Sequence, residues 1–321
     1  MTQRDRIDPP SRMALEQLFE AVPGGFNAIP DIVARRAAVS GLFAALTADL
    51  PPNEAVVHED RAIPGPAGEP AISVRIFRPV GAAGPLPGIY FIHGGGMVLG
   101  DVEGESLTAT MICDQVQAVV VSVEYRLAPE HPYPAGVEDC YAGLLWMADQ
   151  ADELGFDADR LAVYGGSAGG GLTIATVMLA RDRGGPSICF QMPIYPMIDD
   201  RNVTPSSQEI TDIGTWDRSA NIEAWDWYLG GQEADQYAAP ARATTLEGLP
   251  PTFIGVGELD LFRDEDIDFA TRLMQAGVPT ELHVYPGSYH GSELFAPEAE
   301  LSQRIWAARI SALTRALAGT D

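Results

Sequence analysis

Apolar runs of strand length alternate with helix-like segments along much of this chain, and this alternation constrains the fold more than any other feature. The runs are rich in Val, Ile and aromatic residues and lack a regular polar face; they lie at 88–92, 119–123, 161–164, 189–195, 252–256 and 281–285. Strands of this kind are buried on both faces, which is typical of a mostly parallel sheet covered by helices. We therefore predict an α/β fold.

The stretch 161–171, L-A-V-Y-G-G-S-A-G-G-G, joins one of these strands to a helical segment at 172–181. Its Gly165-x-Ser167-x-Gly169 pattern fits a nucleophile elbow, a strained turn that exposes a serine between a strand and a helix. The helix N-terminus beneath the serine favours a developing oxyanion. We predict that Ser167 is a nucleophile and that the N–H of Ala168 helps to form an oxyanion hole.

A serine nucleophile needs a histidine base, and in this topology the base follows the serine along the chain. Two of the five histidines do so. His290 lies in a loop just beyond the apolar run 281–285, whereas His283 lies within that run. Binding groups gather beyond the carboxyl ends of parallel strands, so His290 is the predicted base and His283 the alternative.

The acid that orients the base is predicted by the same rule. Asp260 follows the apolar run 252–256 and so lies on the same sheet edge as Ser167 and His290. Other acids nearby belong to the first turns of the next helix, where carboxylates are normally solvated or pair with the helix dipole; they are Asp264, Asp266 and Asp268. Asp260 is therefore the predicted orienting acid.

The tetrapeptide His93-Gly94-Gly95-Gly96 directly follows the run 88–92. Consecutive glycines leave their N–H groups unobstructed, so this loop is expected to complete the oxyanion hole with Ala168. His93 itself is expected to brace the loop.

Composition excludes several kinds of chemistry and partner. All 20 basic residues are Arg, which rules out a Schiff-base or P-loop lysine. With 45 Asp and Glu the net charge is −25, and no basic patch suits nucleic acid. We found no membrane-span run or secretory signal, and predict a cytoplasmic protein. The three cysteines, which form no C-x-x-C pair, are expected to be reduced thiols: Cys113, Cys140 and Cys189.

Two segments stand outside the alternation. Residues 1–50 have apolar positions at helical spacing, and they could pad the core or cover a pocket. Residues 201–245 show no clear strand and carry large aromatic side chains, which could belong to the core or line a pocket; among them are Trp216 and Trp225.

Together these motifs resemble bacterial esterases of the hormone-sensitive-lipase-like branch of the α/β-hydrolases. The match rests on the H-G-G-G loop, Y-R-L-A-P-E at 125–130, the elbow, I-Y-P at 194–196, the Asp260-x-x-x-Asp264 loop and His290. The resemblance implies a carboxylesterase for short or medium acyl esters, without metal or cofactor. It implies a Ser167–His290–Asp260 triad, and oxyanion donors at Gly95, Gly96 and Ala168, with Gly94 a weaker candidate.

The resemblance also implies a domain organisation. One α/β-hydrolase domain would span 1–321, with a core at 54–199 and 240–321 and a helical cap at 1–50 and 200–230. Met97, which follows the H-G-G-G loop, could line the pocket. The family usually has Asp or Thr before the serine, where this chain has Gly166, and this makes the shape of the pocket harder to predict.

Other functions on the same fold remain open from the sequence. An amidase would use the same triad, a lyase would use the same oxyanion site, and a non-catalytic receptor would typically lack a triad member. The expected partner is a small-molecule ester, and a homodimer through the last strand or the cap is left open.

Overall fold

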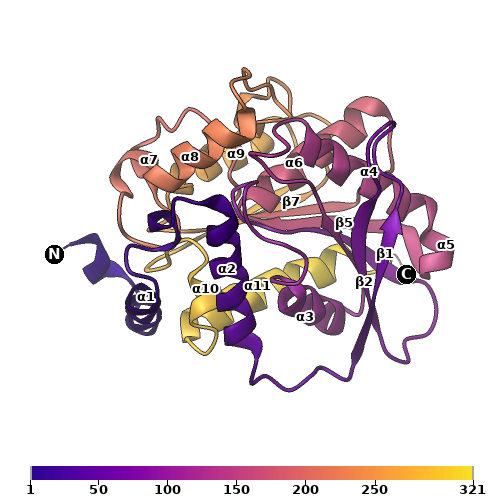
Figure 1. Ribbon diagram of the computed structural model, residues 1–321. Coiled ribbons are helices and arrows are strands. Elements are labelled where there is room, and N and C mark those ends of the chain that lie inside the picture. The colour runs from indigo at the N-terminus through magenta and orange to yellow at the C-terminus, as the bar shows by residue number, and fades with distance from the viewer. Residues whose placement is uncertain (1, 320–321) are drawn as a thin grey trace.

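A mixed sheet of eight strands runs through the middle of the computed structural model, which describes residues 2–319 (Figure 1). Its order is β1-β2-β4-β3-β5-β6-β7-β8, with β2 antiparallel to both of its neighbours and the other pairs parallel. The strands are β1 Val56–Ile63, β2 Ile72–Pro79, β3 Leu86–Ile92, β4 Val119–Glu124, β5 Phe156–Gly166, β6 Phe190–Ile194, β7 Thr252–Gly257 and β8 Thr280–Tyr285. The predicted α/β-hydrolase fold is confirmed.

Helices cover both faces of the sheet (Figure 1). One face packs on α3 Ser106–Val116 and α11 Glu300–Ala316; the other packs on α4 Ala135–Asp149, α6 Ala168–Arg183 and α9 Arg263–Gln275, with the short α5 Ala151–Leu154 leading into β5. Alternate residues of β3 divide between the two layers. Ile89 and Phe91 join the cluster with α3, whereas Tyr90 and Ile92 join the cluster with α4 and α6. This double burial explains why the central strands have no polar face.

The elbow differs in detail from the sequence prediction, because α6 begins at Ala168 and not at residue 172. Glycines are poor helix formers, yet here close packing requires them. A Cβ on Gly169 would lie 2.1 Å from the Ile92 carbonyl oxygen, and one on Gly171 would lie 2.1 Å from that of Met197. The glycines therefore let the first turn of α6 pass directly against neighbouring backbone.

The N-terminal segment folds as η1 Gln3–Arg6, α1 Pro9–Ala21, η2 Phe26–Ala28 and α2 Ile32–Thr47. Both α-helices begin at an aspartate whose side chain caps the helix, Asp8 for α1 and Asp31 for α2. Arg36 of α2 donates to the Val98 carbonyl oxygen and forms a bidentate pair with Glu130, so this segment is tied to the loops after β3 and β4.

The segment between β6 and β7 carries α7 Pro205–Glu209, α8 Arg218–Leu229 and η3 Pro240–Arg242, and α10 Ser292–Phe295 follows β8. α8 is linked to α2 by an ion pair of 2.5 Å between Arg35 and Glu223. In Figure 1, α2 and α8 lie on the same side of the molecule, beyond the sheet edge. Within residues 2–319 no helix is both long and apolar enough to cross a membrane.

Candidate active site

Ser167 lies at a sharp turn between β5 and α6. Its φ of 58° places a non-glycine residue in a sparsely populated, strained region, and its N–H donates to the Ile194 carbonyl oxygen at 2.9 Å. The carbonyl oxygen of Ser167 accepts from the N–H groups of Gly171 and Met197, both at 3.0 Å. These three bonds hold the strained residue and fix the hydroxyl at the N-terminus of α6.

The structure brings His290 and Asp260 to Ser167. Nε2 of His290 lies 2.9 Å from Oγ of Ser167, and Nδ1 lies 2.9 Å from Oδ2 of Asp260. Asp260 is fully buried, and the other two side chains keep a small exposed surface. The imidazole packs edge-on against Phe262 and Tyr195, which fixes its plane. The arrangement fits a nucleophile, its base and an orienting acid.

His283, the alternative base, lies in β8 and contacts neither Ser167 nor Asp260. Its Nε2 lies 2.8 Å from Oε1 of Glu281, and its ring contacts Phe253 and Tyr285.

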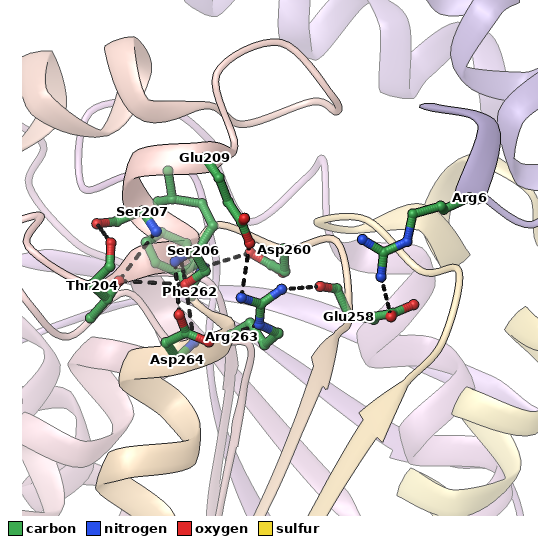
Figure 2. Close-up of polar contacts among 11 residues, drawn as sticks. Arg6, Thr204, Ser206, Ser207, Glu209, Glu258, Asp260, Phe262, Arg263 and Asp264 are labelled. Atoms are coloured by element: carbon green, nitrogen blue, oxygen red, sulfur yellow. Dashed lines mark hydrogen bonds and ion pairs between the residues drawn. The ribbon is translucent and has the colours of Figure 1, made fainter. Parts of the chain in front are cut away.

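The Asp260 loop is held by a polar network that reaches α7 and the N-terminal segment (Figure 2). Oδ1 of Asp260 accepts from the Phe262 N–H at 3.0 Å. Arg263 donates to Oδ1 of Asp264 at 2.8 Å, to the Glu258 carbonyl oxygen at 2.9 Å and to Oε1 of Glu209 at 3.0 Å. Figure 2 also shows Arg6 reaching Glu258 from the N-terminal segment. Residues far apart in sequence thus fix the position of the acid.

Asp264 contributes to this network and does not contact the imidazole. Its Oδ2 accepts from the Ser206 N–H at 2.7 Å, and its own N–H donates to the Ser206 hydroxyl at 3.1 Å. Burial raises the pKa of Asp264, but the Arg263 and Ser206 hydrogen bonds outweigh it, so that the pKa lies below its ordinary value. Asp264 therefore ties α7 to α9.

The H-G-G-G loop faces Ser167 and leaves donors free. In the described residues, the N–H groups of Gly95, Gly96 and Ala168 have no hydrogen-bond acceptor. The Gly94 N–H, the weaker candidate, donates to Oε1 of Glu105 at 2.6 Å and is thereby occupied. The free donors are those suited to an oxyanion.

His93 braces this loop. It is fully buried, and its Nδ1 lies 2.8 Å from the Gly94 carbonyl oxygen. Its ring stacks on Tyr125, with centroids 4.2 Å apart, and the Tyr125 hydroxyl donates to the His93 carbonyl oxygen. Burial lowers the pKa of His93 to about 4, so the ring is neutral near pH 7.

A largely apolar cavity of about 150 Å³ opens beside Ser167 and His290. Trp216, for which the sequence left both a core and a pocket position open, is among the residues that line it. Met97 and Trp225 are not among its lining residues: Met97 is buried against α6, and Trp225 is buried edge-on against Tyr228. Gly166 lines the cavity, and a Cβ there would lie 3.4 Å from the Tyr195 ring.

Sequence reasoning missed several other lining residues. Phe26, Val39 and Phe43 come from the N-terminal segment, while Trp306 and Arg309 come from α11. Arg309 is buried and donates to Oε1 of Glu293 at 2.7 Å, and the same oxygen accepts from the Tyr195 hydroxyl at 2.8 Å. Arg309 lies in the middle of α11, where an arginine in sequence is usually solvent-exposed, so no local signal marked it.

The prediction that the early acids of α9 are solvated is wrong for Asp266. Its side chain is fully buried, and neither carboxylate oxygen has a hydrogen-bond partner within residues 2–319. The cause is helical spacing, because Asp266 shares the inward face of α9 with Phe269, Ala270 and Leu273. Burial raises the pKa of Asp266 well above its ordinary value, and the nearby acids Glu265 and Asp260 add to this effect.

We expect Asp266→Asn to stabilise the protein increasingly as pH rises. The folded carboxyl stays protonated while the unfolded one ionises above its ordinary pKa, so the wild type loses stability as pH rises from that value. Each pH unit then costs about 1.4 kcal/mol, or roughly 2–4 °C in Tm. Thermal unfolding of both proteins from pH 5 to 8 should show a widening difference. Asp268→Asn, on an exposed position of α9, should show none; a constant difference for Asp266→Asn would contradict the argument.

The sheet topology and the strand-to-helix turn at Ser167 define a protein of the α/β-hydrolase class. A family profile described as alpha/beta hydrolase fold matches residues 89–294. Carboxylesterase NlhH of Mycobacterium tuberculosis is 37% identical over 320 residues, covering 98% of this chain and 97% of that protein. The chain belongs to the hormone-sensitive-lipase-like esterase family and is a carboxylic ester hydrolase.

Solved structures agree with this assignment. A structure titled Bacterial Heroin Esterase superposes with a TM-score of 0.94 at 40% identity, covering 99% of this chain and 100% of that one. A hyperthermophilic esterase from the archaeon Pyrobaculum calidifontis gives a TM-score of 0.89 at 34% identity, covering 97% and 99%.

Proposed function

We propose that this carboxylesterase works through a Ser167–His290–Asp260 triad and an acyl-enzyme intermediate. The single observation that carries the proposal is the pair of 2.9 Å contacts that His290 makes, through Nε2 with Ser167 and through Nδ1 with Asp260. His290 takes the proton of the Ser167 hydroxyl as Oγ attacks the ester carbonyl carbon. Buried Asp260 keeps the other ring proton on Nδ1 and stabilises the imidazolium that forms.

The N–H groups of Gly95, Gly96 and Ala168 donate hydrogen bonds to the carbonyl oxygen and stabilise the negative charge that develops on it. Donors that are already in place cost no reorganisation when the charge develops, and each contributes roughly 10²–10³ in rate. His290 then passes its proton to the leaving alcohol. Water, deprotonated by His290, attacks the acyl-enzyme and releases the acid together with the free Ser167 hydroxyl.

Residues 1–50 and 200–230 form the cap of this esterase in our proposal, over a core at 54–199 and 240–321. Support comes from the cavity lining, to which the first segment contributes Phe26, Val39 and Phe43 and the second contributes Trp216. At about 150 Å³ the cavity is smaller than the roughly 300–1,000 Å³ of drug-sized ligand sites. We infer a preference for short to medium acyl chains. The cytoplasmic location stays a prediction.

Hydrolysis of p-nitrophenyl esters from acetate to palmitate tests the chain-length preference. We expect kcat/KM to be highest between acetate and octanoate and to fall at least about tenfold by palmitate, since methylenes that the cavity cannot hold lose their binding energy. Activity that rises steadily to palmitate would contradict the confined acyl site while leaving the esterase class intact.

A further inference from the structure

The cavity beside Ser167 is mostly apolar, but three charged side chains line it: Asp101, Glu105 and Arg309. Two of them are engaged. Asp101 accepts from the Gly104 N–H at 2.6 Å and from the Ser40 hydroxyl at 2.9 Å, one bond to each oxygen. The charge of Arg309 is balanced by Glu293, which lies 2.7 Å from Nη2, and the guanidinium lies over the Trp306 ring. Its Nε and Nη1 have no partner within residues 2–319, but both are buried away from solvent. Glu105 is engaged through one oxygen only.

Glu105 is the residue that precedes α3, and its side chain lies next to the nucleophile. Its Oε1 accepts from the Gly94 N–H at 2.6 Å. A Cβ built on Gly94 would lie 3.2 Å from that oxygen and 3.6 Å from Cβ of Ser167, so the carboxylate and the nucleophile flank the same glycine. The second oxygen, Oε2, has no partner within residues 2–319, and it is not sealed from solvent. One carboxylate oxygen is therefore left for a ligand.

An unpaired carboxylate in an apolar cavity is costly in its charged form. Burial raises the pKa of Glu105 to about 7, with Asp101 adding to the rise and Arg309 opposing it. A ligand that brings a positive charge and an N–H donor to Oε2 would compensate the lost solvation. A ligand carboxylate would instead face two like charges, at Glu105 and Asp101.

We propose that Glu105 is a specificity-determining residue that makes the enzyme favour esters carrying an ammonium group over their uncharged isosteres. The proposal rests on the ester-hydrolase function proposed above. Glu105 contacts the substrate through Oε2 while its Oε1 keeps the H-G-G-G loop in place. The overall charge of −25 also draws cations toward the protein, but this field is screened over about 8 Å at physiological salt, whereas the Glu105 contact is not.

Two isosteric substrate pairs test the proposal, with the charge on either side of the ester bond. The first pair is 2-(dimethylamino)ethyl acetate and 3-methylbutyl acetate. The second is methyl 4-(dimethylamino)butanoate and methyl 5-methylhexanoate. Each pair differs only by an ammonium nitrogen in place of a CH group at neutral pH. The readout is the kcat/KM of the charged ester divided by the kcat/KM of its isostere. A substitution that alters the hydrolysis of both esters equally leaves this ratio unchanged.

Glu105→Gln is the test variant, because glutamine keeps an oxygen for the Gly94 N–H and removes the charge. Glu103→Gln is the matched control: it removes the same charge two residues away, from a side chain that is 79% exposed and outside the cavity. We expect Glu105→Gln to lower the ratio about tenfold for at least one pair, because a hydrogen bond between charged groups is stronger than one between neutral groups. The pair that responds identifies the side of the ester that Glu105 faces.

An unchanged ratio in Glu105→Gln, or an equal fall in Glu103→Gln, would overturn the proposal. Binding to the Ser167→Ala protein, measured by calorimetry with and without Glu105→Gln, provides a readout that needs no turnover. Preferential binding of the ammonium ester that disappears with Glu105→Gln supports the proposal; preference that survives contradicts it. If the wild type hydrolyses none of the four esters, the proposed function fails, while the binding comparison still tests Glu105.

Discussion

Replacing Ser167 with alanine is expected to lower kcat for ester hydrolysis by about 10⁶-fold, the loss seen when the nucleophile of a triad is removed. Without Oγ no acyl-enzyme can form, and His290 and the oxyanion donors can only assist direct attack by water. The residual rate should still exceed the uncatalysed one, because the Gly95, Gly96 and Ala168 donors remain. Hydrolysis of p-nitrophenyl butyrate by wild type and variant measures the effect.

The matching control is Ser187→Ala, which removes a hydroxyl from an exposed residue before β6. Its rate should equal that of the wild type, and thermal unfolding should show both variants folded. Because the Ser167 hydroxyl makes no hydrogen bond within residues 2–319 except that with His290, its removal should cost little stability. A Ser167→Ala protein that keeps more than about one hundredth of the wild-type rate would mean that another group is the nucleophile.

Replacing Asp260 with asparagine should lower kcat about 10⁴-fold while leaving the fold intact. Oδ1 of Asp260 accepts from the Phe262 N–H, and the side chain of the introduced asparagine would keep that bond with its single oxygen. Its NH₂ group would then face Nδ1 of His290, which forces the ring proton onto Nε2. In that tautomer the nitrogen facing Ser167 is a donor and cannot take the hydroxyl proton.

Asp268→Asn is the control for this substitution, because it makes the same change at an exposed site on the following helix. It should leave kcat and KM unchanged. If the kcat of Asp260→Asn stayed within about tenfold of that of the wild type, another residue would have to orient His290 and the proposed triad would be wrong.

Much of the fold could be predicted from the sequence because burial on both faces leaves a direct mark. Strands β3, β4, β6 and β7 have few polar residues, and this pattern identifies a helix-covered parallel sheet without knowledge of any contact. β5 begins five residues before the predicted run. The sequence missed this start because the first residues of the strand include Asp157 and Arg160, which are only partly buried. These polar residues resemble a loop in the sequence, although the backbone there belongs to a strand that pairs with β3.

The triad geometry could be anticipated because topology determines which loops meet. Strand ends of a parallel sheet share one edge, so a serine, an acid and a histidine that each follow a strand come together. The pocket could not be anticipated in the same way. Its walls are contributed by Phe26 and Phe43 near the N-terminus and Arg309 near the C-terminus, and no spacing rule links these positions.

Single side chains at helix starts were the least predictable. Glu105 and Asp266 both read as ordinary acids near a helix N-terminus, where carboxylates usually meet solvent. In the structure Glu105, which precedes α3, lines the cavity, and Asp266 is fully buried on the inward face of α9. Helix orientation is a tertiary property, and a single sequence does not contain it.

The most direct test of Ser167 as the nucleophile is labelling with a fluorophosphonate, which forms a stable adduct with an activated serine. Cleavage after Arg160 and Arg181 gives a peptide of residues 161–181 in which Ser167 is the only serine. We expect one adduct per chain, on Ser167, with loss of esterase activity in proportion to labelling. An adduct on a different residue, or full activity after Ser167 is modified, would contradict the assignment of Ser167 as the nucleophile.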